Sequence, residues 1–231
     1  METKKLIVAL DVDSLEEARK IATELREYVD IYKIGSRLFT IGGPESVKIV
    51  KETGAGVFLD LKLHDIPNTV GETSEAIAGL NVDMYDVHTL GGLEMMKAAK
   101  EGSGVRPGCP LVFGVTVLTH LNESIIKEEL GICRMLEEEV LCLSRLAVEA
   151  GLDGIICSPR EISGVRKICG DKLIITPGVR PEWAMLHDQR RSLTPKQAME
   201  AGADYIVVGR PIIEAQDRRE AAEKILEEMK S

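Results

Sequence analysis

The sequence predicts a closed (β/α)8 barrel that occupies the whole chain, residues 1–231, as a single domain. Short apolar runs of the β type alternate with longer helical patterns about eight times, which is the number of units that such a barrel needs. The strand runs are nearly continuous in apolar residues, as is typical of a parallel sheet buried on both faces. No proline- or glycine-rich linker separates the repeats, so they belong to one unit.

The individual elements follow from this alternation. Strands are expected at residues 6–10, 31–34, 57–63, 84–88, 111–118, 154–157, 173–176 and 205–209. The helical patterns that follow them cover residues 14–28, 44–52, 69–79, 93–100, 124–130 with 135–150, 159–168, 195–201 and 211–230. Ser14 and Glu17 form a capping box that marks the start of the first helix. A doubly wound open sheet is the alternative, but the glycine-rich loop expected after its first strand is missing.

Composition excludes several classes of function. With 231 residues, of which 44% are hydrophobic, the chain can bury a substantial core. The net charge of −9 argues against a general nucleic-acid surface. Aromatic residues make up only 3%, so no stacking platform for single strands is visible. A small anionic substrate remains compatible, because a few arginines can reverse the field inside one pocket.

The sequence also predicts a cytoplasmic protein that needs no metal or cofactor. The first apolar run is too short for a signal peptide, and no stretch approaches the length that crosses a membrane. The five cysteines are odd in number and include no C-x-x-C pair, so neither a disulfide framework nor a zinc site is expected. The four histidines are too scattered for a metal cluster and are expected to be structural or peripheral; they are His64, His88, His120 and His187.

Polar side chains gather at the carboxyl ends of the expected strands, where barrels of this type carry their chemistry. In chain order these residues are Asp11, Asp13, Lys33, Asp60, Lys62, Asp65, Asp86, His88, Thr119 and His120. Charged groups on otherwise apolar strands are expensive to bury. A ring of them at one end of the barrel therefore predicts a site.

The segment from Asp60 to Asp65 is the most informative part of this ring. Asp60 and Lys62 are two residues apart in a strand, so their side chains point the same way. Asp65 follows just beyond, next to a turn at residues 66–68. Nearby carboxylates favour the ammonium form of Lys62. One interpretation is an ion pair that ties the strand end to the loop, and the other is a charged reaction centre.

The ends of the last two strands predict a phosphate site. Arg180 follows the seventh strand, and Gly209-Arg210-Pro211 follows the eighth. Gly209 lets backbone N–H groups approach an oxyanion, and the helix after Pro211 would point its positive end there. The guanidinium group of Arg210 can add a bidentate contact to the phosphate. The same tripeptide also occurs at ordinary helix starts.

The polar residues 180–193 between these strands lack core periodicity and are predicted to form a lid that covers the phosphate. A closed lid would exclude water and strengthen the electrostatic interactions beneath it. Gln189 would then be an uncharged contact to the substrate. A solvated loop is the alternative.

These motifs resemble those of the orotidine 5′-phosphate decarboxylase family. The matching segments are residues 9–11, 32–35, 59–70, 116–119, 176–180, 188–190 and 208–211, so the resemblance spans the chain. The D-x-K-x-x-D core is shared with sugar-phosphate decarboxylases and aldolases of the same barrel superfamily. The I-P-N-T that follows it and the segment Asp188-Gln189-Arg190 resemble the orotidylate branch.

The resemblance implies a cofactor-independent decarboxylation of orotidine 5′-phosphate to UMP, the last step of pyrimidine nucleotide synthesis. Lys62 would protonate C6 of the pyrimidine, and Asp60 would lie beside the departing carboxylate. The other implied substrate contacts are Asp11, Lys33 and Asp65 at the ribose and in the charge network, Ile66, Thr119 and Pro177, Gln189 between base and phosphate, and Arg180, Gly209 and Arg210 at the phosphate.

The resemblance further implies a homodimer, because Asp65 and Thr69 would reach into the neighbouring subunit's site. Two other functions stay open at this point. One is a magnesium-dependent decarboxylase or aldolase that acts on a sugar phosphate, with Asp60 and neighbouring acids holding the metal. The other is a barrel that binds a phosphorylated ligand without catalysis.

Overall fold

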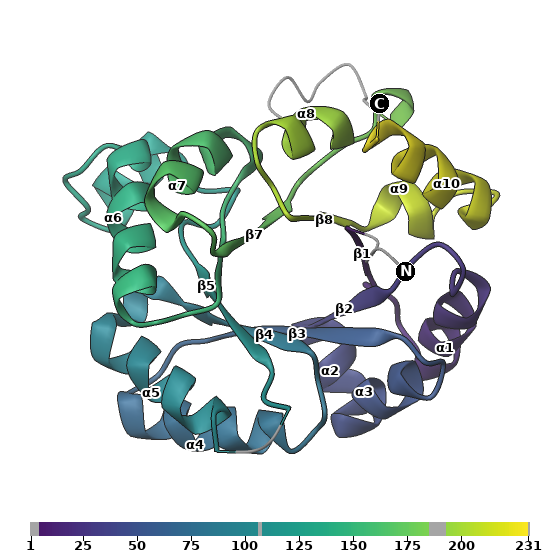
Figure 1. The fold of residues 1–231 in the computed structure, drawn as a ribbon, viewed down its shortest axis with the longest axis horizontal. Helices are drawn as coiled ribbons and strands as arrows, with labels where there is room; N and C mark the ends of the chain where they lie inside the picture. Colours follow the sequence, from purple (N-terminus) through teal and green to yellow (C-terminus); the bar gives the residue numbers. More distant parts are fainter. Residues whose placement is uncertain (1–4, 106–107, 185–192, 231) are drawn as a thin grey trace.

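The computed structural model describes residues 5–105, 108–184 and 193–230, which form a closed barrel of parallel strands (Figure 1). Each strand pairs with the next, and β8 closes the barrel on β1. The strands are β1 (Leu6–Ala9), β2 (Ile31–Gly35), β3 (Gly56–Leu63), β4 (Met84–His88), β5 (Leu111–Val115), β6 (Gly154–Ile156), β7 (Leu173–Pro177) and β8 (Tyr205–Val208). The predicted (β/α)8 barrel is confirmed, and the open sheet is excluded.

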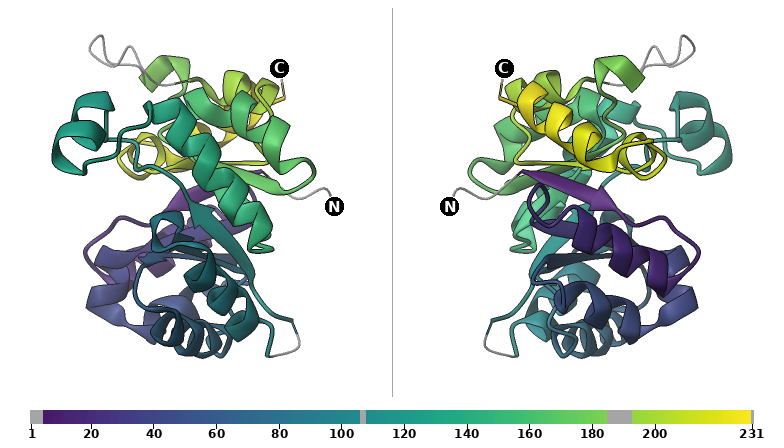
Figure 2. Two further views of the ribbon diagram at one scale, coloured as in Figure 1. Left: turned by 90° about the vertical axis from the view of Figure 1, so that its left-hand side faces the viewer. Right: turned by 90° about the vertical axis from the view of Figure 1, so that its right-hand side faces the viewer.

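Helices cover the outside of the barrel on all sides (Figures 1 and 2). The α-helices are α1 (Leu15–Glu24), α2 (Ser36–Gly42), α3 (Pro44–Lys51), α4 (Pro67–Ala78), α5 (Leu93–Ser103), α6 (Leu136–Glu149), α7 (Ile162–Cys169), α8 (Pro195–Glu200), α9 (Arg210–Ile213) and α10 (Arg218–Glu228). The shorter turns are η1 (Thr89–Gly91), η2 (Ile125–Glu129), η3 (Pro159–Glu161) and η4 (Glu182–Ala184). Within the described residues, no helix is both long and apolar enough to cross a membrane.

Several observed elements differ from the predicted ones. The helix predicted over residues 211–230 is interrupted, because Asp217 accepts the backbone N–H groups of Arg219 and Glu220, each at 3.0 Å, and so starts α10 anew. The strand predicted over 111–118 ends at Val115. Helix α2 was not predicted, since it is short and buries only Leu38.

The start of α1 agrees with the prediction. The Oγ of Ser14 accepts the backbone N–H of Glu17 at 3.1 Å. This contact satisfies one of the amide groups that a helix start leaves without an intrahelical partner.

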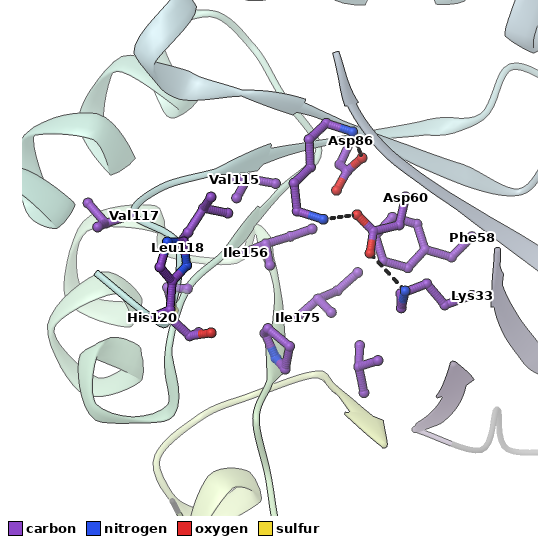
Figure 3. Close-up of a pocket in the computed structure, with 15 residues that line it drawn as sticks. Lys33, Phe58, Asp60, Asp86, Val115, Val117, Leu118, His120, Ile156 and Ile175 are labelled. Carbon is purple, nitrogen blue, oxygen red and sulfur yellow. Dashed lines mark hydrogen bonds and ion pairs between the residues drawn. The ribbon is translucent and has the colours of Figure 1, made fainter. Parts of the chain in front are cut away.

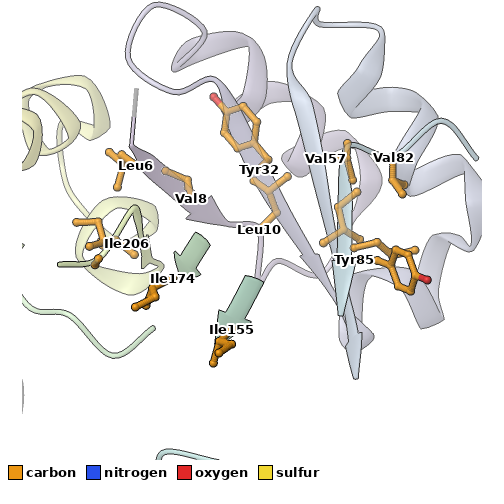
Figure 4. Packing of buried hydrophobic residues seen from close by; sticks show 14 of the residues in the cluster. Leu6, Val8, Leu10, Tyr32, Val57, Val82, Tyr85, Ile155, Ile174 and Ile206 are labelled. Atoms are coloured by element: carbon orange, nitrogen blue, oxygen red, sulfur yellow. The ribbon is translucent and has the colours of Figure 1, made fainter. Parts of the chain in front are cut away.

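Strand side chains alternate between two separate cores. Leu6, Val8 and Tyr32 belong to the outer core, which lies between the barrel and its helices (Figure 4). The inner core fills the barrel itself and consists of Ile7, Ala9, Ile31, Phe58, Met84, Phe113, Val115, Ile156, Ile175 and Val207. Burial of each large side chain stabilises the fold by roughly 1.5–3 kcal/mol. Because these side chains fill the interior, the barrel is not an open channel. The inner core forms the floor, that is, the base, of any pocket at the end of the barrel.

Candidate active site

A pocket of about 270 Å³ opens above this floor, at the carboxyl ends of the strands (Figure 3). Its lining residues are Lys33, Phe58, Asp60, Lys62, Asp86, Val115, Val117, Leu118, Thr119, His120, Ile156, Cys157, Ile175, Pro177 and Val207. The side formed by β2, β3 and β4 is charged, whereas β5 to β8 contribute mostly apolar side chains. Of the predicted site residues, Lys33, Asp60, Lys62, Thr119 and Pro177 line this pocket.

The charged side of the pocket is a cluster of Lys33, Asp60, Lys62 and Asp86, here called the charged cluster. Asp60 lies at its centre: its Oδ2 is 3.0 Å from Lys33 Nζ, and its Oδ1 pairs with Lys62 Nζ. The Lys33 and Asp60 side chains are only 13% and 12% exposed. Asp60 therefore holds two ammonium groups at a fixed spacing on the wall of the pocket.

The backbone at Lys62 has an unusual conformation. Its φ is +50°, in the left-handed region that costs a side-chain-bearing residue roughly 1–2 kcal/mol. The register of β3 against β4 shifts here, because Leu59 pairs with Tyr85 but Leu63 pairs with Val87. Bulges of this kind often re-aim a side chain next to an active site.

Asp86 on β4 supports this bulge. The backbone N–H of Lys62 donates to Asp86 Oδ1 at 2.8 Å. The Asp86 side chain is buried, with 1% of the residue exposed. A carboxyl group on the neighbouring strand is therefore the direct backbone partner of the lysine.

Electrostatics separate the two carboxyl groups of the charged cluster. Burial alone would raise the pKa of Asp60, but the charge of Lys33, a hydrogen bond with Asp86 and the charge of Lys62 hold that pKa at about 2. Burial raises the pKa of Asp86 well above its ordinary value, and the negative charge of Asp60 raises it further. Asp60 is thus the ionised partner, and Asp86 is the carboxyl group that keeps a proton more readily.

The cationic partner Lys33 is also shifted. Burial alone would lower the pKa of Lys33, but the charges of Asp60 and Asp11 raise it above its ordinary value. Asp11 Oδ1 lies 3.6 Å from Lys33 Nζ. Asp11 therefore extends the charged cluster toward the ends of β1 and β8.

Gly209 lies beside Asp11 at the end of β8. A Cβ atom added to Gly209 would lie 3.7 Å from Asp11 Oδ2, and Arg210 directly after it begins α9. Burial lowers the pKa of Arg180, and the like charge of Arg210 lowers it further. The two arginines therefore lie close enough to repel, which is the arrangement that a bound dianion would stabilise.

The two ends of the segment 180–193 meet. The backbone N–H of Arg180 donates to the carbonyl oxygen of Leu193 at 3.0 Å. Gln189 and the rest of residues 185–192 lie outside the described residues, so the lid and its glutamine contact stay predictions.

Comparison with known proteins identifies the family. The family model described as "Orotidine 5'-phosphate decarboxylase / HUMPS family" matches residues 4–225. The chain belongs to this family. It is 47% identical to the orotidine 5′-phosphate decarboxylase of Heliobacterium modesticaldum, over 99% of this chain and 97% of that relative. It is also 47% identical to the enzyme of that name from Carboxydothermus hydrogenoformans, over 98% of this chain and 96% of that relative.

Solved structures of the orotidine 5′-phosphate decarboxylase family share the barrel. The crystal structure of the Lactobacillus acidophilus protein of that name superimposes with a TM-score of 0.87 at 39% identity, covering 99% of this chain and 100% of that one. The protein of that name from Pyrococcus horikoshii OT3 gives a TM-score of 0.79 at 29% identity, covering 98% of this chain and 99% of that one.

Residues 64–69 of the segment 59–70, which resembles the family, are all exposed in this single chain, and they include Asp65, Ile66 and Thr69. Asp65 Oδ1 accepts the backbone N–H of Ile66 at 2.6 Å, at the start of α4. Ile66 itself is 65% exposed. In the described part of one chain, Lys62 thus meets Asp60 but not Asp65, and the role of Asp65 at a neighbouring site stays a prediction.

Of the four histidines, His120 lines the pocket, whereas His187 lies outside the described residues. The expectation that the histidines are structural or peripheral stays a prediction. The ring of His88 stacks on that of His64, with centroids 5.4 Å apart. Burial, then the charges of His64 and Lys62, lower the pKa of His88 to about 4. No three His, Cys, Asp or Glu side chains in the described ranges are grouped so that they could hold a metal ion.

Asp86 was recognised from the sequence as a polar strand residue, but its contact with Lys62 was not predicted. That contact depends on the register of β3 against β4, where Lys62 and Asp86 are 24 positions apart in the chain. The sequence signal was a carboxylate in the middle of an otherwise apolar strand, which requires a partner when it is buried.

Proposed function

We propose that this chain decarboxylates orotidine 5′-phosphate to UMP without a cofactor, through a C6 carbanion that Lys62 stabilises and then protonates. The observation that supports this proposal most directly is the position of the Lys62 ammonium group. Asp60 holds it on the wall of a pocket that is otherwise largely apolar. Family membership and the named relatives support the substrate and the reaction.

The chemistry requires a fixed positive charge. When the bond between C6 and the carboxylate breaks, its electron pair remains on C6 in the plane of the ring, where the π-system cannot readily delocalise it. The proton on Lys62 Nζ then passes to C6 and leaves a neutral amine. An ammonium group that is already in place stabilises this transition state more than the ground state.

The apolar side and the charged side of the pocket both favour loss of CO2 from the substrate. The substrate carboxylate is charged, whereas the departing CO2 is neutral, and an apolar surface accepts a neutral group at a lower free-energy cost than a charged one. Val115, Ile156 and Ile175 supply such a surface opposite the charged cluster. Asp60, beside the departing carboxylate, adds like-charge repulsion that is relieved when CO2 leaves.

The remaining contacts hold the nucleotide far from C6. Arg180, Gly209 and Arg210 bind the phosphate, with Gln189 bridging base and phosphate from the lid. Asp11 and Lys33 bind the ribose hydroxyls, while Thr119 and Pro177 contact the base. Binding energy at the phosphate end can stabilise the closed, reactive arrangement even though it touches no reacting atom.

The proposal includes a cytoplasmic homodimer in which Asp65, Ile66 and Thr69 complete the neighbouring site. Their exposure in the single chain, with the large apolar side chain of Ile66 at the surface, supports this arrangement. All five cysteines are free thiols, which suits a reducing compartment.

An ultraviolet absorbance assay with orotidine 5′-phosphate, run with and without EDTA, tests the reaction. We expect UMP to form at the same rate in both, and Lys62→Ala to abolish it. Loss of activity with chelator would favour the metal-dependent alternative. Tight binding of UMP without turnover would favour the alternative of a non-catalytic binding protein. Full activity of Lys62→Ala would contradict the role proposed for Lys62.

A mixing experiment tests the shared site. Lys62→Ala and Asp65→Ala are each expected to be inactive alone. Mixed dimers contain one site with both changes and one site with neither, so random exchange of subunits should restore about a quarter of the wild-type activity. A mixture that stays inactive although subunits have exchanged would show that Asp65 serves its own subunit's site.

A further inference from the structure

Asp86 is a buried carboxyl group that the reaction proposed above does not use. Its Oδ1 accepts the backbone N–H of Lys62, whereas its Oδ2 is buried and meets no donor among the described residues. A buried oxygen without a donor is destabilising and is uncommon in folded proteins. The position therefore needs an explanation.

Charged groups face Asp86 from the strands on one side, and the other side is apolar. Asp60 and Lys62 come from β3, Lys33 comes from β2, and His88 follows two residues later on β4. On the β5 side Asp86 pairs with Phe113, and Val115 of the same strand lines the pocket. One oxygen of Asp86 points toward the carboxylate of Asp60 (Figure 3).

Two adjacent carboxylates repel each other when both are ionised. A single proton on Asp86 Oδ2 removes that repulsion and turns the contact into a hydrogen bond donated to Asp60. The same proton gives Oδ2 the partner that it otherwise lacks. The opposite pKa shifts of the two groups, with Asp60 at about 2 and Asp86 raised by burial, agree with this distribution.

We propose that Asp86 is a positioning residue for the lysine, holding the left-handed backbone of Lys62 through Oδ1 and the Asp60 carboxylate through a protonated Oδ2. This inference rests on the proposed function, in which the Lys62 ammonium group must meet C6. Asp86 touches both the backbone and, through Asp60, the side-chain end of the lysine. It therefore fixes the direction in which Nζ points.

The unusual backbone explains why such a support is needed. A lysine with φ of +50° relaxes toward an extended conformation unless its surroundings prevent it. The N–H bond to Asp86 lies at the register shift between β3 and β4, where regular strand pairing is interrupted. Displacement of a reacting group by about 1 Å can lower a rate by about 100-fold.

Two substitutions separate positioning from packing. In Asp86→Asn, the amide oxygen can still accept from Lys62 N–H and the amide nitrogen can still donate to Asp60. Asp86→Leu has a similar size and can do neither. We expect the Asn variant to keep kcat within about threefold, and the Leu variant to lose about 100-fold in kcat. KM should change little in both, because Asp86 is assigned no contact with the nucleotide.

Thr89→Val is the matched control. Thr89 is fully buried directly after β4, and its Oγ1 donates to the carbonyl oxygen of Val115 at 2.8 Å. Its replacement should lower the melting temperature without changing kcat. Titration with UMP shows whether the Leu variant keeps a folded binding site, and Asp86→Ala repeats the test if Leu is too large.

The outcomes decide the inference separately from the proposed function. Wild-type kcat in both Asp86→Leu and Asp86→Ala, or an Asn variant as slow as the Leu variant, would overturn it. A loss confined to KM would also overturn it, since that would show ground-state binding. If the wild-type protein itself does not act on orotidine 5′-phosphate, the proposed function fails first, and these comparisons do not apply.

Discussion

The two ends of the barrel both carry aspartates, but they use them differently. At the amino ends of β4, β6 and β8, one carboxylate accepts a backbone N–H of the preceding strand and pairs with a cation from the helix that leads into that preceding strand. The three units are Asp83 with Val57 N (2.7 Å) and Lys51 (2.9 Å), Asp153 with Val112 N (2.8 Å) and Lys100 (2.5 Å), and Asp204 with Ile174 N (2.7 Å) and Arg166 (2.5 Å).

The three units share a local sequence pattern as well. Each aspartate follows a buried apolar residue, and before that stands a residue with positive φ, as in Asn81-Val82-Asp83, Gly151-Leu152-Asp153 and Gly202-Ala203-Asp204. The left-handed residue ends the helix, the apolar residue enters the core, and the aspartate ties the next strand to its neighbour. Every partner in these units belongs to the preceding strand or to the helix that leads into it.

At the carboxyl end, partners are shared rather than matched one to one. Asp60 serves two ammonium groups, one oxygen of Asp86 meets no donor within the described residues, and Lys62 has a left-handed backbone. An arrangement that satisfies every polar group is built for stability, whereas one that leaves groups strained or unpaired is typical of a reaction site. The aspartates at the amino end of the barrel therefore stabilise the fold, whereas those at the carboxyl end belong to the candidate reaction site.

The largest expected effect comes from removing one charge at each end. Lys62→Ala should lower kcat by about 10⁴-fold or more, because it removes both the stabilising charge and the proton donor. Its melting temperature should stay close to that of the wild-type protein. Asp153→Ala should leave kcat unchanged. Ultraviolet assays and thermal unfolding of both variants check the contrast, which fails if Asp153→Ala is folded but inactive.

How far the sequence predicts each end depends on the distance over which the information acts. The barrel and the polar strand ends were predictable, because hydrophobic periodicity and strand boundaries are local properties. The pairing of Asp60 with Lys62 was predictable from a spacing of two residues. The contact of Asp86 with Lys62 was not, because it follows from the register between two strands. The position of His120 at the pocket was not predictable for a similar reason, since only the fold brings the segment after β5 there.

A smaller effect is expected on stability at the amino end. Asp153→Ala leaves the N–H of Val112 without its acceptor and Lys100 without its partner, which should cost about 1–3 kcal/mol of unfolding free energy. Each kcal/mol corresponds to roughly 2–4 °C in melting temperature for a chain of this size. Lys97→Ala is the control, because its pair with Glu94 is exposed on α5 and should matter by less than about 1 kcal/mol. Equal losses in both variants would show that the repeated unit has no special role.

The smallest effect is expected at the carboxyl end, as a dependence of stability on pH. An unfolded aspartate has a pKa near 3.9, whereas burial and Asp60 raise the pKa of Asp86 in the folded protein. Above about pH 4 the folded state therefore binds a proton that the unfolded state has lost, so the contribution of Asp86 to stability falls as the pH rises. The slope is at most about 1.4 kcal/mol per pH unit.

Asp86→Asn removes this titration while keeping both hydrogen bonds. The melting temperature of the Asn variant minus that of the wild-type protein should therefore increase with pH, starting from a small difference near pH 4. A pH series of thermal unfolding curves measures it, and the same series on Asp83→Asn is the reference for a carboxylate that pairs with a single cation at the amino end. A difference for Asp86→Asn that stays constant or shrinks as the pH rises would mean that Asp86 is ionised in the folded protein. The aspartates at both ends of the barrel would then be ionised in the folded protein, and the proposed hydrogen bond from Asp86 to Asp60 would be wrong.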